Sequence, residues 1–160
     1  FEAFFMGDSV AVMKDGELVQ HGSPESVFSD PNTSDLADVF EMSNFLPATV
    51  DKEGFVSEIG VFPKFAEIRE GNLVEIMLRP DCVELVPCNS GMGKVISRVF
   101  RGMHYLYSVN LKSGKSIEVL MPHSARFDSG TEVDIKILDN HGFTCYFDGK
   151  IIQRSKVGSG

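Results

Sequence analysis

The segment Cys88–Val95 comes nearest to a phosphate-binding loop in this sequence. Such a loop reads GxxxxGK followed by Ser or Thr, because backbone N–H groups surround the phosphates and the hydroxyl binds magnesium. Here Cys88 replaces the first glycine, and Val95 stands where the hydroxyl residue is required. The Gly-Met-Gly within the segment also fails as a dinucleotide fingerprint, since Ile96 replaces the third glycine. We therefore interpret this segment as a turn that enters a strand.

The histidines and serines predict no catalytic or metal site. No histidine has a second one at i+4, and none lies near a cysteine at zinc-site spacing. There is no GxSxG nucleophile elbow. We expect no catalytic residue, no cofactor-binding residue and no metal ligand in this chain. The scattered histidines are His21, His104, His123 and His141.

Three arginines are the candidates for contact with an anionic effector or a protein partner: Arg79, Arg98 and Arg101. Phe100 precedes Arg101 and gives the nearest approach to a mixed basic and aromatic patch. Arg79 has a second interpretation, in which it ties a turn through structural hydrogen bonds. The many phenylalanines are mostly not interleaved with basic residues, so we expect them to fill cores rather than to stack on bases.

The charge of the chain is uneven along its length. The 160 residues contain 15 Lys and Arg and 23 Asp and Glu, which gives a net charge of −8 and argues against nucleic-acid binding. Residues 1–43 contain nine of the acids and one base, Lys14, whereas the remainder is neutral. This shift predicts either a domain boundary near Ser43 or a solvated acidic face. Three cysteines suggest no disulfide framework, and no apolar run is long enough to span a membrane.

The first 43 residues are expected to form a hairpin and two short helices. Asp15-Gly16 suits a tight turn between two strands. Ser23-Pro24 is typical of a helix start, with serine as the cap and proline at the first helical position. A second helix is expected from Thr33 or Ser34, with Leu36 among the residues of its apolar face.

After Asn44 the hydrophobic period becomes two, which predicts strands with one face towards a core. Many short strands punctuated by glycine favour a small barrel or sandwich. The spacing Gly-x-x-Val-x-Ile occurs at Gly71 and again at Gly130. It marks either two related β subunits or two strands that follow glycine turns. The alternating runs are Val95–Phe100, Tyr105–Leu111 and Val133–Ile137.

Several short stretches resemble ABC transporter ATPases. Glu2-Ala3 with Asp8–Met13, then Gly16–Phe28 and Pro31, is similar to the end of their nucleotide-binding domain. Leu78–Asp81 resembles the [IV]RPE word of the TOBE domain. The P-loop, signature motif and switch histidine of that family are absent from this chain. The resemblance is therefore to the C-terminal part of an ABC transporter ATP-binding subunit.

This resemblance implies a mainly β fold: an OB-like small β-barrel of TOBE type, preceded by a short α/β segment. We expect residues 1–43 to be the remnant of the ATPase domain, 44–155 the TOBE regulatory domain and 156–160 a flexible tail. The implied role is non-catalytic regulation and dimerisation, in a full-length parent that hydrolyses ATP with Mg to import a solute. The solute expected first is ferric iron, with polyamine, sulfate or sugar as alternatives.

The implied partners are a second copy of the subunit and transmembrane permease subunits, with a small anion as effector and no nucleic acid. The parent would lie on the cytoplasmic face of the membrane. Phe4, Phe5 and Met6 would lose the motor domain on which they should pack, so we expect self-association or strand exchange. The alternative hypothesis is a small oxyanion- or metal-binding β domain that senses an effector.

Overall fold

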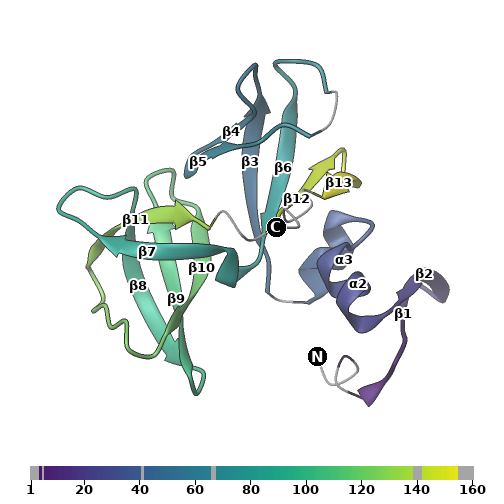
Figure 1. The fold of residues 1–160 in the computed structure, drawn as a ribbon, viewed down its shortest axis with the longest axis horizontal. Helices are drawn as coiled ribbons and strands as arrows, with labels where there is room; N and C mark the ends of the chain where they lie inside the picture. Colours follow the sequence, from purple (N-terminus) through teal and green to yellow (C-terminus); the bar gives the residue numbers. More distant parts are fainter. Residues whose placement is uncertain (1–3, 5, 41, 66–67, 139–141, 155–160) are drawn as a thin grey trace, which may run out of the picture.

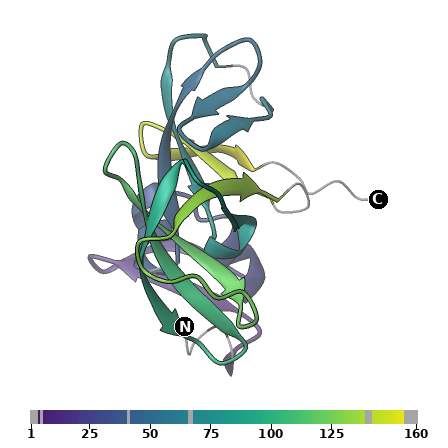
Figure 2. The same ribbon diagram turned by 90° about the vertical axis from the view of Figure 1, so that its left-hand side faces the viewer.

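The computed structural model describes residue 4 and the ranges 6–40, 42–65, 68–138 and 142–154. Strands predominate, and the two described helices contain six residues each. The strands form one six-stranded sheet, one five-stranded sheet and one hairpin (Figure 1). Figure 2 shows from a second direction that the six-stranded sheet lies at one end, with the five-stranded sheet and residues 6–40 below it.

The chain begins with the hairpin that the Asp-Gly pair predicts. Strands β1 (Val10–Lys14) and β2 (Glu17–Gly22) are antiparallel. Asp15 and Gly16 have φ values of 51° and 85°, which glycine and aspartate tolerate best. The predicted turn is confirmed.

Both predicted helices are present and are capped as expected. In α2 (Pro24–Ser29), the Ser23 hydroxyl accepts the Ser26 N–H at 3.2 Å, and proline occupies the first position. Thr33 caps α3 (Ser34–Val39) in the same way. Each cap satisfies an N–H group that the helix itself leaves unpaired.

A small apolar cluster holds the hairpin and the helices together, and it includes Phe4. The Phe4 ring lies 5.8 Å from that of Phe28 and 5.1 Å from that of Phe40, in edge-on geometry. Phe4 therefore packs within the chain, and the expected self-association stays a prediction. Met6 is 86% exposed, and Phe5 lies outside the described residues. The buried members of the cluster are Val10, Val27, Leu36 and Phe40.

The six-stranded antiparallel sheet is assembled from two distant parts of the chain. Its order is β13-β12-β6-β3-β4-β5. The C-terminal hairpin thus pairs with β6 and flanks the strands that follow α3. The strands are β3 (Asn44–Val50), β4 (Phe55–Ser57), β5 (Gly60–Phe62), β6 (Leu73–Leu78), β12 (Thr144–Phe147) and β13 (Lys150–Arg154).

The five-stranded antiparallel sheet is contiguous in sequence, and a 3-10 turn, η1 (Pro80–Cys82), leads into it from β6. Its order is β10-β9-β8-β11-β7. The strands are β7 (Val83–Pro87), β8 (Gly93–Phe100), β9 (His104–Leu111), β10 (Ser116–Pro122) and β11 (Glu132–Ile137). Segment 88–95, rejected as a phosphate loop, is the connection from β7 and the start of β8.

The mainly β, OB-like fold is confirmed, but the sheet does not close into a barrel. The outer strands β7 and β10 approach each other, since the Leu85 N–H points at the Met121 sulfur from 3.4 Å. The described parts of these strands do not pair as a ladder. Instead, the Asn44 side chain occupies the β10 edge at Glu118, where a closing strand would bind.

Side chains of both sheets share one hydrophobic core. The alternation predicted for β9 and β11 is confirmed, because Tyr107, Val109, Val133 and Ile135 are buried. The expectation for β8 is wrong after Val95, since a β-bulge shifts the register there and leaves Val99 50% exposed.

The repeated glycine spacing occurs once in each large sheet. Gly71 precedes β6 and Gly130 precedes β11, with φ values of 86° and 91°. The predicted boundary falls between α3 and β3. The division into 1–43, 44–155 and 156–160 stays a prediction, and its last segment lies outside the described residues.

Candidate functional site

Arg79 sits at the junction between the six-stranded sheet and the first 43 residues. It precedes Pro80, which favours the extended backbone seen here (φ −76°, ψ 152°). Its guanidinium donates to the Met42 carbonyl at 2.8 Å, to the Ser43 hydroxyl at 2.6 Å and to the Phe28 carbonyl. One planar fork of donors thus reaches two separate segments.

The same guanidinium stacks on an aromatic ring. Its central carbon lies 3.8 Å from the Phe28 ring centroid and 6.0 Å from that of Phe40. Arg79 is half-buried by these contacts. These contacts agree with the second interpretation of Arg79, in which it makes structural hydrogen bonds. Its contact with an effector or a protein partner stays a prediction.

Arg98 and Arg101 lie together on the β8–β9 hairpin, away from Arg79. Arg98 donates to the Phe127 carbonyl at 2.9 Å and lies 3.5 Å from a carboxylate oxygen of Asp128. Its guanidinium carbon is 5.3 Å from the Tyr105 ring centroid. Asp128 is 94% exposed, so the ion pair contributes little. The Arg101 side chain is exposed at the turn, and its effector role, like that of Arg98, stays a prediction.

Backbone and tyrosine contacts missed by the sequence analysis also join the first 43 residues to the C-terminal hairpin. The Tyr146 hydroxyl donates to the Pro31 carbonyl at 2.8 Å. The Ile151 N–H donates to the Asn32 carbonyl at 3.2 Å, and the Ser34 N–H to the Gly149 carbonyl at 3.2 Å. Burial raises the pKa of Tyr146 well above its usual range, so this donor keeps its proton. Contacts over more than 100 residues have no local sequence signal.

Asn44 connects the two large sheets. Its side chain is buried, donates to the Glu118 carbonyl at 2.6 Å and accepts the Glu118 N–H at 2.7 Å. This pair satisfies both main-chain groups of one β10 residue. An asparagine at the start of a largely apolar strand was the available signal for this contact.

The buried thiols are unsuited to nucleophilic chemistry. Burial raises the pKa of Cys82 to about 11, with further contributions that include the nearby Asp81 carboxylate. Burial raises the pKa of Cys145 to about 12. Both thiols are protonated at neutral pH, whereas the thiolate is the reactive form.

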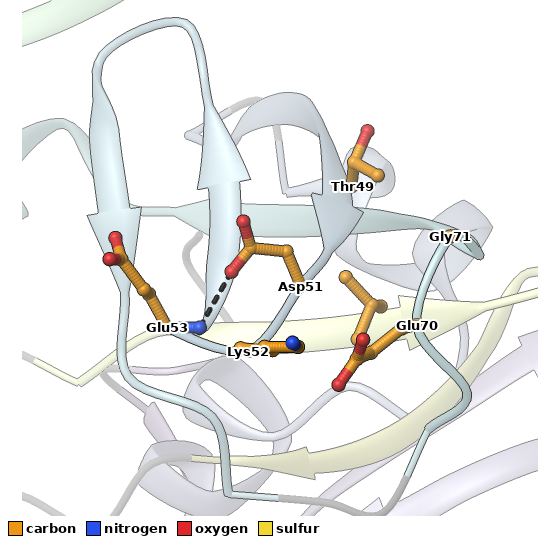
Figure 3. A pocket seen from close by; sticks show the side chains of 7 residues that line it. Thr49, Asp51, Lys52, Glu53, Glu70 and Gly71 are labelled. Carbon is orange, nitrogen blue, oxygen red and sulfur yellow. Dashed lines mark hydrogen bonds between the residues drawn. The ribbon is translucent and has the colours of Figure 1, made fainter.

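A cavity of about 480 Å³ opens between the β3–β4 turn and the segment before β6. Three carboxylates and one amine line it: Asp51, Glu53, Glu70 and Lys52 (Figure 3). One Asp51 oxygen accepts the Glu53 N–H at 2.6 Å. A second cavity of about 300 Å³ is lined by Asp35, Asp38 and Glu75, with Ser34 and Phe45. Carboxylate-rich linings repel oxyanions.

Within the described ranges, no group of three His, Cys, Asp or Glu side chains could hold a metal ion. The described helices are too short to cross a bilayer.

Comparison with known proteins identifies the β region. Residues 76–144 match the TOBE domain family. The chain contains a TOBE domain. This domain covers the end of β6, the whole five-stranded sheet and the start of β12, and so it includes all three candidate arginines.

Most of the chain is also similar to ABC transporter ATP-binding subunits. It is 33% identical over 141 residues to the spermidine/putrescine import ATP-binding protein PotA of Borreliella afzelii, covering 84% of this chain and 39% of the relative. The PotA protein of Borrelia garinii subsp. bavariensis gives the same identity and coverage. That of Desulfitobacterium hafniense is 32% identical over 146 residues, which is 87% of this chain and 40% of the relative.

The predicted resemblance to the C-terminal part of an ABC transporter ATP-binding subunit, with its TOBE domain, is confirmed. The chain spans about two fifths of the length of the relatives it matches.

Proposed function

We propose that this chain is the non-catalytic regulatory and dimerisation region of an ABC importer ATP-binding subunit. The observation that carries the proposal is the joint match to a TOBE domain and to import ATP-binding proteins over 84% of the chain. The full-length parent binds ATP and Mg, hydrolyses ATP and works with transmembrane permease subunits on the cytoplasmic face of the membrane.

We propose a polyamine as the solute of the parent. The relatives named above are spermidine/putrescine import proteins, which favours polyamine over the ferric iron expected first from the sequence. Sulfate and sugar gain no support from these relatives.

The alternative, an oxyanion- or metal-sensing domain, has less support. Arg79 and Arg98 already donate to main-chain carbonyls, and each of the two cavities described above has three carboxylates in its lining. Exposed Arg101 remains available to a partner.

Reconstitution of the complete subunit with its permease in proteoliposomes tests the proposal. We expect ATP-dependent uptake of labelled spermidine, and no release of phosphate from ATP by the 160-residue chain alone. Uptake of ferric complexes instead of spermidine would refute the assigned solute, and ATP hydrolysis by the isolated chain would refute the non-catalytic role.

A further inference from the structure

The turn of the β8–β9 hairpin exposes apolar side chains beside basic ones. Val99 is 50%, Phe100 62% and Met103 76% exposed. The bulge after Val95 causes part of this, because it turns Val99 outwards. Arg101 and His104 are exposed at the same turn. We call residues 99–104 the basic hairpin surface.

This surface belongs to the most basic stretch of an acidic protein. Residues 93–127 contain six Lys and Arg and a single acid, Glu118, although the whole chain has a net charge of −8. Arg98 pairs with Asp128, whereas other basic side chains of the stretch are exposed. The exposed ones are Lys94, Arg101, Lys112 and Arg126. A surface with this charge attracts an acidic partner.

The β1–β2 hairpin has the complementary chemistry. Met13 and Leu18 are 58% and 59% exposed, and the acids Asp15 and Glu17 are exposed at the turn between them. The one Lys or Arg of this hairpin, Lys14, is 3.2 Å from a carboxylate oxygen of Asp35. We call residues 13–18 the acidic hairpin surface.

We infer that the basic hairpin surface of one copy binds the acidic hairpin surface of a second copy. This inference rests on the proposed dimerisation and assigns residues to it. The β1–β2 hairpin and the five-stranded sheet lie at opposite ends of the long axis (Figure 1). Two copies placed antiparallel about a two-fold axis therefore form the same contact twice and close into a dimer.

Both surfaces favour a protein occupant over a nucleic acid. Phe100 is the one Phe, Tyr or Trp side chain within residues 13–18 and 99–104. The other exposed apolar side chains, Val99, Met103, Met13 and Leu18, are aliphatic or thioether groups, which pack against one another when water is excluded. Single-stranded nucleic acid is bound instead by series of aromatic side chains.

Sedimentation equilibrium of the 160-residue chain tests this contact. We expect a dimer whose dissociation constant increases with salt, since exposed charges are screened. Arg101→Glu and Glu17→Lys should each raise that constant about tenfold, because each change acts at both symmetrical contacts. Combining the two should restore dimerisation, since the charges are then exchanged. Met103→Ser should weaken the dimer without changing its salt dependence.

The matched control is Lys52→Glu, which reverses an exposed charge in the β3–β4 turn. It should leave the dissociation constant unchanged. A dimer that is insensitive to Arg101→Glu would overturn this contact and leave the proposed dimerisation standing. A chain that is monomeric at every concentration would overturn dimerisation by this region and the contact with it. Single-stranded DNA binding that is lost in Arg101→Glu, without any effect on the dimer, would assign the surface to a polyanion and overturn the inference.

Discussion

Replacement of Arg79 by alanine should weaken the attachment of the N-terminal hairpin and helices to the β region, while the Tyr146 and Ile151 contacts remain. The variant loses three hydrogen bonds from a charged donor, to Phe28, Met42 and Ser43, and the stacking on Phe28. Hydrogen bonds to charged groups contribute about 1.5–3 kcal/mol each when buried, and a cation–π contact about 0.5–1 kcal/mol at an exposed site. Since Arg79 is half-buried and its carbonyl partners can regain water, we expect a net loss of about 3 kcal/mol.

Urea unfolding followed by far-ultraviolet circular dichroism measures this loss, because the chain has no tryptophan. Hydrogen exchange shows where in the chain stability is lost. In the Arg79→Ala variant, the backbone amides of α2, α3 and the segment before β3 should exchange faster than in the unchanged chain. Arg79→Lys keeps the charge but loses the planar fork, so it should recover less than half of the stability. The matched control Arg126→Ala removes an exposed arginine and should change the stability by less than about 0.5 kcal/mol. An Arg79→Ala variant as stable as that control would refute the reasoning.

Further predictions concern single groups. Asn44→Ala should cost about 2 kcal/mol in urea unfolding, because both Glu118 main-chain groups at the β10 edge lose their partner; an unchanged midpoint would contradict this. Folding raises the pKa of the Cys82 and Cys145 thiols, so protonation of these thiols contributes to the free energy of unfolding in full below pH 9. This contribution should be lost as the pH rises through about 11 and 12. In Cys145→Ala, the free energy of unfolding should fall less steeply as the pH rises above 9. An equally steep fall would contradict the assignment of this pH dependence to Cys145. Calorimetry with molybdate and sulfate should give no heat of binding, and saturable heat that disappears in Arg101→Ala would support the sensor alternative instead.

Local signals in the sequence were sufficient to predict the β1–β2 hairpin and the two helices α2 and α3. The Asp15-Gly16 turn, the Ser23 cap and the Thr33 cap are each determined by side chains within four residues, so the structure confirms them. Period-two alternation likewise predicted β9 and β11, where Tyr107, Val109, Leu111, Val133 and Ile135 are buried.

Non-local arrangements were not predictable in the same way. The pairing of β12 with β6 joins residues about 70 positions apart, and the Tyr146 contact with Pro31 spans 115. Neither leaves a pattern in the intervening sequence. The bulge in β8 was missed because strict alternation was assumed for Val95–Phe100, although apolar and polar residues come in pairs there and only Val95 of this run is buried. The sequence left two alternatives for Arg79, an effector or partner contact and a structural role. Its hydrogen bonds to Phe28, Met42 and Ser43 could be seen only in the folded chain.

The most direct test of the account is the oligomeric state of the complete subunit in the absence of nucleotide. It should be compared with a truncation that ends at the residue equivalent to Ser43. We expect the complete subunit to be a dimer by sedimentation and the truncated one to be a monomer. A truncated subunit that dimerises as tightly as the complete one would contradict it.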